Sequence, residues 1–459
     1  MSNFTTDAQL CIERELELPN IYNDFTDINT QFHISETCKW INEHNYTKVC
    51  LQFPDELLGL SASIYEELKK ETTADLYILG DTSYASCCVD AVAALHVQSD
   101  AIIHYGHTCF SKSNIPVYLV LNETPLDVAK TLNTLKQDIN LASQTDICLF
   151  YDCGFEHLKD ELAEHWFLLY PTGFIAYIDM KNESNHKFFG RVVKNKDNEE
   201  FSSDKLKDCI CVYIGSRGQT FFNFSVSIPA QKWYILDPTT NQIDIVNETA
   251  WFKRRRHLVE KCKDANVVGI LICKLAGEET KDIITRMKQL CKANGKKSYI
   301  VSVGKPNVPK LANFPEIDIY VMIACPENDL YNSRDFYKPL VYPYELEVAL
   351  NTNRDPYFTT HITDYDQLLP GRKHYCDINE VVEGTDVSLI TGKIRETKLT
   401  NATGSNELAE KQNWELESIG QNLQNRSWKG LEQKLGETEV KTVEQGRKGI
   451  PLQYNNEPE

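Results

Sequence analysis

The chain has 459 residues, of which 42% are hydrophobic and 25% charged, a balance typical of a globular protein with several domains. Its net charge of −18 argues against a nucleic-acid partner, because phosphate backbones are bound by clustered lysine and arginine. The first ten residues lack a basic stretch followed by an apolar core, and the apolar run 267–273 is too short to span a bilayer. We therefore expect a cytoplasmic protein without membrane contact, whose 15 cysteines stay reduced.

Predicted helices and strands alternate along the first part of the chain. Apolar residues at helical spacing predict helices over 35–44, 56–70 and 89–96. Short apolar runs bounded by polar or turn residues predict strands over 48–53, 76–79, 101–104 and 117–121.

The same order of elements is repeated twice further along the chain. Helices are predicted over 127–136, 156–165, 248–263, 278–292 and around 344–350. Strands are predicted over 147–151, 211–215, 267–272, 298–302 and 318–323. The polar stretch 181–207 is predicted to be an irregular insertion.

Alternation of this kind favours parallel sheets covered by helices. We predict an α/β protein of three similar domains, each a small, mainly parallel sheet flanked by helices. The expected boundaries are 1–122, 123–236 and 237–391. Residues 392–459 are predicted to be a largely flexible tail, because the composition there becomes polar and poor in β-branched residues.

Three widely separated cysteine positions each follow a predicted strand: the pair Cys87 and Cys88, then Cys109, then Cys325. In parallel α/β sheets, ligands bind at the carboxyl ends of the strands. Thiolates brought there from separate domains could hold one soft metal centre. The sequence has no CxxC or CxxxCxxC pattern, so the fold would have to assemble any such site.

Each candidate also has a structural interpretation. Cys87 and Cys88 are as readily explained by two core or turn cysteines as by a thiolate activated at a helix amino terminus. His104 and His107 close to Cys109 could indicate zinc, although histidines that only satisfy hydrogen bonds at a strand end are the more common case. Cys153 also follows a strand and is held as a reserve candidate, and most other cysteines are expected to pack in the core.

Several enzyme classes lack their usual signals. The sequence contains no GxGxxG or Walker pattern for nucleotide binding and no GxSxG pattern for a serine hydrolase. We assign no catalytic residue.

Four segments carry a resemblance to a known family: LQFPDELLG (51–59), GDTSYASCCVD (80–90), HYGHTC (104–109) and SRDFYKPLVYPYE (333–345). They resemble the diphthamide biosynthesis family, which forms 2-(3-amino-3-carboxypropyl)histidine synthase, and in particular its second subunit. The resemblance spans roughly 10–358 and returns at 426–431 and 446–454. It implies three similar α/β domains around a central cavity, each able to offer one cysteine to a 4Fe-4S cluster.

The resemblance also implies a function. Catalytic members cleave S-adenosylmethionine and transfer its 3-amino-3-carboxypropyl group to a histidine of translation elongation factor 2. The family's ligand positions correspond here to Cys87 or Cys88, with Cys88 favoured, and to Cys109 and Cys325. Catalytic members have a further cysteine in the middle domain, and the matching stretch around 190–193 has none.

This departure implies an accessory subunit paired with diphthamide biosynthesis protein 1. Its cluster would pass an electron, received from a small electron-donor protein and its reductase, to the catalytic cluster of the partner. S-adenosylmethionine would be a co-substrate of the complex. The alternatives are a self-sufficient homodimeric synthase in which Cys109 replaces the missing ligand, a metal-free scaffold subunit, and a structural zinc protein.

Overall fold

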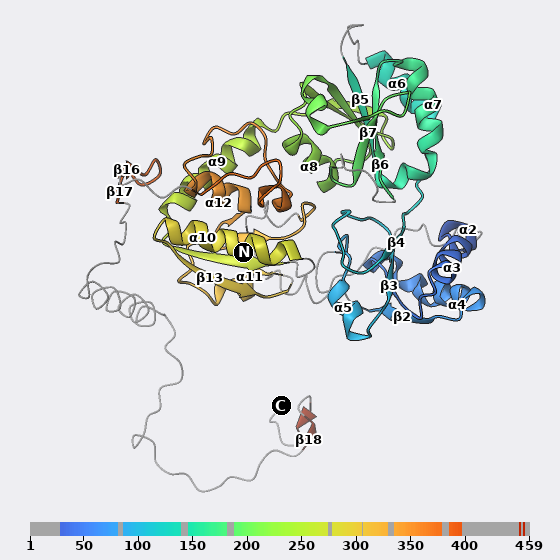
Figure 1. Cartoon of the computed structure of the whole chain (residues 1–459), viewed down its shortest axis with the longest axis horizontal. Helices are drawn as coiled ribbons and strands as arrows, with labels where there is room; N and C mark the ends of the chain where they lie inside the picture. Colours follow the sequence, from blue (N-terminus) through green and yellow to red (C-terminus); the bar gives the residue numbers. More distant parts are fainter. Residues whose placement is uncertain are drawn as a thin grey trace. The chain divides into compact units, whose positions relative to one another are not determined.

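The structure is a computed structural model of the whole chain (Figure 1). It describes residues 28–80, 86–138, 146–180, 188–273, 278–304, 306–328, 335–378, 385–396, 449–450 and 453–454. The chain divides into two compact units, Met1–Thr400 and Asn401–Glu459. The described residues of the second unit form a short antiparallel pair, β18 (Gly449–Ile450) and β19 (Gln453–Tyr454).

The first domain is built on a parallel sheet with strand order β2-β1-β3-β4. The strands are β1 (Lys48–Gln52), β2 (Asp75–Leu79), β3 (Ala101–Tyr105) and β4 (Val117–Val120). The helices are α2 (Ile28–Gln31), α3 (Ile34–Glu43), α4 (Ser61–Glu71) and α5 (Ala91–His96), with a 3-10 turn at Asp55–Leu60. Every residue of β3 is buried, because this central strand is covered on both faces.

The second domain contains a sheet with strand order β11-β10-β9-β5-β6-β7-β8. Its parallel core is β10 (Lys232–Asp237), β9 (Ile210–Ile214), β5 (Ile147–Tyr151) and β6 (Phe174–Ile178). The antiparallel edges are β11 (Gln242–Ile245), β7 (Arg191–Lys194) and β8 (Glu200–Phe201). The helices are α6 (Val128–Asp138), α7 (Lys159–Leu169) and α8 (Gln219–Ser227), with 3-10 turns at Cys153–Leu158 and Ser203–Asp208.

Strand β5 shows how this sheet is covered on both faces. Ile147 and Leu149 pack in one core with residues of α6 and α7. Cys148 and Phe150 point the other way, into a core shared with α8. Successive side chains of a strand point to opposite faces, so a fully apolar run marks a strand with helices on both sides.

The prediction of an irregular insertion over 181–207 was wrong for its described part. Residues Arg191–Lys194 and Glu200–Phe201 form β7 and β8, and they extend the sheet because β7 pairs antiparallel to β6 and β8 pairs antiparallel to β7. Val192 and Val193 are buried there, which explains why a mostly polar stretch is held in the sheet. Residues 181–187 lie outside the described part.

The third domain repeats the parallel arrangement with strand order β13-β12-β14-β15. The strands are β12 (Val267–Ile272), β13 (Lys297–Ser302), β14 (Ile319–Ile323) and β15 (Leu340–Val341). The helices are α9 (Thr249–Asp264), α10 (Glu278–Ala293), α11 (Val308–Ala312) and α12 (Pro343–Leu350), with a 3-10 turn at Tyr365–Leu368. The predicted fold class, several small and mainly parallel sheets flanked by helices, is therefore confirmed.

Helix α12 carries two glutamates that are fully buried, Glu345 and Glu347. Glu345 pairs with Arg255 of α9 through two hydrogen bonds and lies 3.2 Å from the Nε2 atom of His361. Burial alone would raise the pKa of Glu345, but Arg255 and His361 outweigh it and hold that pKa at about 2. Glu347 is paired in the same way with Arg286 of α10 and with Arg354.

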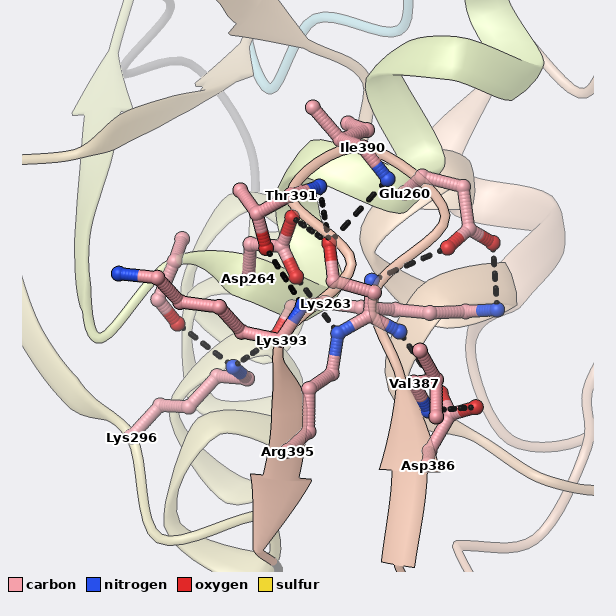
Figure 2. A network of polar contacts seen from close by, with 12 residues as sticks. Glu260, Lys263, Asp264, Lys296, Asp386, Val387, Ile390, Thr391, Lys393 and Arg395 are labelled. Carbon is pink, nitrogen blue, oxygen red and sulfur yellow. Dashed lines mark hydrogen bonds and ion pairs between the residues drawn. The ribbon is translucent and has the colours of Figure 1, made fainter.

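A short hairpin of β16 (Thr385–Val387) and β17 (Ile394–Glu396) is attached to α9 by Arg395 (Figure 2). The Arg395 guanidinium lies 2.6 Å from Asp264, 3.1 Å from Glu260 and 2.7 Å from Asp386. Residues 392–396 are therefore part of this hairpin, and the prediction of a flexible tail from 392 was wrong for them. The rest of the predicted tail, apart from β18 and β19, lies outside the described residues.

The Arg395→Ala change is expected to loosen the hairpin by about 1–3 kcal/mol, because three carboxylates lose their shared charged donor. Hydrogen exchange of residues 385–396 should become much faster, while that of the β12 strand stays unchanged. Lys393→Ala is the matched control, since that side chain is exposed on the same hairpin. Equal exchange rates in the Arg395→Ala variant and the unmodified protein would contradict this role.

None of the helices in the described part of the chain combines the length and the apolar character needed to cross a bilayer.

Candidate metal centre

The structure brings the four predicted cysteines together. Cys87 and Cys88 lie between β2 and α5, and Cys109 follows β3, so the first domain supplies three thiols. Cys325 follows β14 of the third domain. The four Sγ atoms all lie within 4.8 Å of one another. Within the described ranges, this is the one group of three or more metal-ligating side chains of this kind.

The four thiols are buried and form two close pairs. Cys87 Sγ lies 3.8 Å from Cys325 Sγ, and Cys88 Sγ lies 3.7 Å from Cys109 Sγ. None of the four residues is more than 8% exposed. Hydrogen bonding to Cys109 and burial raise the pKa of both Cys87 and Cys325. Four thiolates could share this space only around a cation, because their charges repel one another in a poorly hydrated site.

Gln52 holds the chain that carries the cysteine pair. This side chain ends strand β1 and is 1% exposed. Its Nε2 atom donates to the carbonyl of Cys88 at 2.7 Å, and its Oε1 atom accepts from the backbone N–H of Asp90 at 2.9 Å. The carboxylate of Asp90 in turn caps helix α5 by accepting from the N–H of Ala93 at 2.9 Å.

His104 and Cys109 hold the same turn from strand β3. Burial lowers the pKa of His104, and its neutral ring places Nε2 3.1 Å from the carbonyl of Ser86. The backbone N–H of Cys109 donates to the carbonyl of Cys87 at 3.1 Å. His104 thus positions the backbone of the turn that carries the cysteine pair. Its ring does not belong to the group of four converging side chains.

His107 connects three domains beside the cysteines. Its Nδ1 atom lies 3.1 Å from Cys153 Sγ of the second domain, and its Nε2 atom makes a short contact with Glu327 of the third. Burial would lower the pKa of His107, but Cys153 and Glu327 raise it to about 11. Cys153, the reserve candidate, therefore contacts His107, and the group of four thiols does not include it.

Glu327 and Gln52 were not recognised as site residues from the sequence. Glu327 lies two positions after Cys325, and Gln52 falls within the strand predicted over 48–53. These positions close to strand ends were the only signal that the sequence offered for either residue. Only the fold shows that Gln52 faces the cysteine turn and that Glu327 faces His107.

A cavity of about 750 Å³ adjoins the thiols. Cys109 and Cys325 form part of its wall, and residues of all three domains line the remainder. The ion pair between Lys373 and Asp204, 2.5 Å apart, joins the third domain to the second at this cavity. One side of the cysteine group therefore faces a space large enough for a ligand or for solvent.

The donor set suits a soft metal centre. Four thiolates are the usual ligands both of a single zinc ion and of a 4Fe-4S cluster. The fold and the site together define a multidomain α/β protein with a buried four-thiol site assembled from two domains.

The chain belongs to the diphthamide synthesis family. The family model described as "Putative diphthamide synthesis protein" matches residues 53–358. Curated relatives are named 2-(3-amino-3-carboxypropyl)histidine synthase subunit 2. The protein from Danio rerio is 34% identical, with 99% of this chain and 97% of the relative covered. The Gallus gallus protein is 34% identical (99% and 98% covered), and the Homo sapiens protein 30% identical (99% and 99% covered).

Two solved structures share the fold. Crystal structures of Dph2 from Pyrococcus horikoshii match at 22% identity, one of them described as containing a 4Fe-4S cluster. The first covers 76% of this chain and 96% of its own, with a TM-score of 0.56. The structure with the cluster covers 74% and 95%, with a TM-score of 0.55.

Proposed function

We propose that this protein is the accessory, cluster-bearing subunit of the enzyme that performs the first step of diphthamide biosynthesis in the cytoplasm. In this reaction the 3-amino-3-carboxypropyl group of S-adenosylmethionine is transferred to a histidine of translation elongation factor 2. The partner is the catalytic subunit, diphthamide biosynthesis protein 1. A 4Fe-4S cluster held by Cys87, Cys88, Cys109 and Cys325 would supply the partner's cluster with one electron at a time.

The convergence of four thiols from two domains carries this proposal. Among the residues that the structure describes, this buried group consists of cysteines alone, a donor set that suits an iron–sulfur cluster. Support comes from the relatives named subunit 2, which indicates an assembly of different subunits. The archaeal structure described with a 4Fe-4S cluster supports the kind of cofactor.

The second domain supports the accessory role. In the described structure it contributes no cysteine to the group of four. Cys148, Cys209 and Cys211 are buried in its own apolar core, and Cys153 contacts His107. In the catalytic members of the family that the sequence resembles, each domain offers one cysteine. The ligand arrangement of this chain therefore differs from theirs.

Metal analysis of the anaerobically purified heterodimer tests this function. We expect iron and acid-labile sulfide in equal amounts bound to this subunit, and a paramagnetic resonance signal after reduction. In rapid mixing, the reduced subunit should then reduce the oxidised cluster of its partner. A heterodimer in which this subunit holds neither iron nor sulfide, yet which turns over normally, would contradict the proposal and favour a scaffold.

A structural zinc site is the second candidate, because of the distances between sulfur atoms. A Zn–S bond of about 2.3 Å in a tetrahedron places sulfur atoms about 3.8 Å apart. The observed pairs at 3.7 and 3.8 Å match that spacing. One zinc per chain and no sulfide in the same metal analysis would establish this alternative.

A further inference from the structure

We infer that the third domain carries a docking surface for an acidic protein segment with apolar side chains. The surface is formed by the exposed side of α9 together with the outer face of the β16–β17 hairpin. Both elements belong to the same unit of the chain, and Arg395 joins them through ion pairs (Figure 2). The inference depends neither on what the thiols hold nor on the proposed function.

The hairpin exposes a large share of the apolar side chains found on the surface. Of the 13 large hydrophobic side chains that are exposed in the described structure, four lie between positions 387 and 394. They are Val387, Leu389, Ile390 and Ile394, and Leu389 is 82% and Ile394 67% exposed. Single exposed apolar side chains are ordinary, whereas a group of neighbours marks an interaction surface.

The apolar face of the hairpin points away from α9. Asp386 and Arg395 are paired across the two strands, and Arg395 contacts α9. The next pair along the strands, Val387 and Ile394, lies on the opposite face, because successive side chains alternate. A two-stranded hairpin has no core of its own. Arg395 therefore fixes this hairpin in place while its apolar face stays open to a partner.

The exposed side of α9 is basic. The helix buries Trp251, Arg255, Val259 and Cys262 on one side. On the other side it exposes Lys253, Arg254, His257 and Lys261. Positions 253, 257 and 261 are four residues apart and so follow one line along the helix. Within the described residues, no ion pair is formed by Lys253, Arg254 or Lys261.

The hairpin neutralises the acidic side chains of the same helix. Helix α9 has two of them, Glu260 and Asp264. Arg395 lies 3.1 Å from Glu260 and 2.6 Å from Asp264, and the hydroxyl of Ser388 donates to Asp264 at 2.8 Å. The charge that remains on the exposed side of α9 is therefore positive, in a chain whose net charge is −18. A partner that covers both elements needs acidic groups beside apolar ones.

A short protein segment fits this surface better than an extended anionic one. Screening limits the reach of the basic row to about 8 Å at physiological salt, so a narrow partner interacts mainly with that row. A membrane or a nucleic acid would face more of the acidic chain. Single-stranded nucleic acid is also bound by stacking on aromatic side chains, and residues 386–395 contain none.

Fluorescence anisotropy of a labelled helical peptide made of glutamate and leucine tests the inference on the full chain. We expect binding that weakens with salt, because exposed charges are screened. Changing Lys253, His257 and Lys261 together to glutamate should weaken binding by about tenfold or more, since three exposed charge contacts become repulsive. The double change Leu389→Ser and Ile394→Ser should weaken it by about tenfold through lost apolar burial.

Helix α10 supplies the matched control. It also has 16 residues, and it exposes Lys281, Lys288 and Lys292 in the same domain without an adjoining apolar hairpin. Changing these three lysines to glutamate should leave the affinity within about twofold. All the altered side chains are exposed, so every variant should keep the thermal unfolding curve of the unmodified protein.

Three kinds of result would overturn the inference. One is a peptide that does not bind the unmodified chain, or that binds the α9 or hairpin variant as tightly, or that is lost equally from the α10 variant. Another is tighter binding of a single-stranded RNA, or of vesicles of phosphatidylcholine and phosphatidylserine, than of the peptide. The last is self-association of the chain that Leu389→Ser and Ile394→Ser abolish, which would assign the surface to a second copy.

Discussion

The double change Cys109→Ala and Cys325→Ala is expected to abolish cluster binding. Only the adjacent Cys87 and Cys88 would remain, and both approach from the same turn of the first domain. Removing a residue that only hydrogen-bonds to a metal ligand already lowers metal affinity by about 10–100-fold. Loss of two direct ligands should therefore lower the amount of bound iron by more than about tenfold. Iron and sulfide analysis after anaerobic reconstitution provides the measurement.

The matched control is the double change Cys50→Ala and Cys273→Ala. These cysteines are equally buried and belong to the same two domains, but they lie outside the four-thiol group. We expect this control to keep its full iron content. Iron retained in the Cys109→Ala and Cys325→Ala protein would show that the iron is bound elsewhere.

The Glu345→Ala change is expected to lower the free energy of unfolding by about 3–5 kcal/mol, because it leaves the Arg255 guanidinium buried without its carboxylate. Arg255 and Glu345 connect α9 to α12, so the loss should destabilise the third domain in particular. Urea denaturation followed by tryptophan fluorescence would measure it, since Trp251 lies on α9 and its ring packs 5.1 Å from that of His361.

The pH dependence of stability gives a second measurement of the same pair. The pKa of Glu345 is held at about 2, below its value of about 4.3 in an unfolded chain. The stability from the ionised carboxylate is therefore present above about pH 4.3 and is lost as the pH falls towards 2. The Glu345→Gln variant should lose this acid-dependent part. An unchanged acid profile in that variant would contradict the assigned role of Glu345.

Strands at the centres of the sheets could be predicted from the sequence. The runs that form β1, β5 and β12 are short, apolar and bounded by polar residues, as expected for strands covered on both faces. Strands β7 and β8 were missed because they add to the sheet edge by antiparallel pairing, which needs few apolar residues. The β16–β17 hairpin was missed because it depends on Glu260 and Asp264, which lie far earlier in the chain.

The candidate site was predictable in its cysteines and not in its supporting residues. Cys109 and Cys325 stood out because each follows a central parallel strand, and such strand ends lie where ligands bind. The sequence left open whether Cys87 or Cys88 points to the site, since a turn can present either side chain. The contacts of Gln52 with the Cys88 turn and of His107 with Glu327 depend on tertiary packing, which no local pattern reports.

The division of the thiols between the first and third domains has a consequence for biogenesis. A chain leaving the ribosome presents Cys87, Cys88 and Cys109 well before Cys325 has been synthesised, and amino-terminal domains generally fold first. If the four thiols hold the proposed cluster, its assembly must wait until β14 has folded and has brought Cys325 to the other three cysteines. The iron content of the protein in cells would then depend on folding of the third domain. The Glu345→Ala change, which alters no cysteine but destabilises that domain, should therefore also lower the iron content.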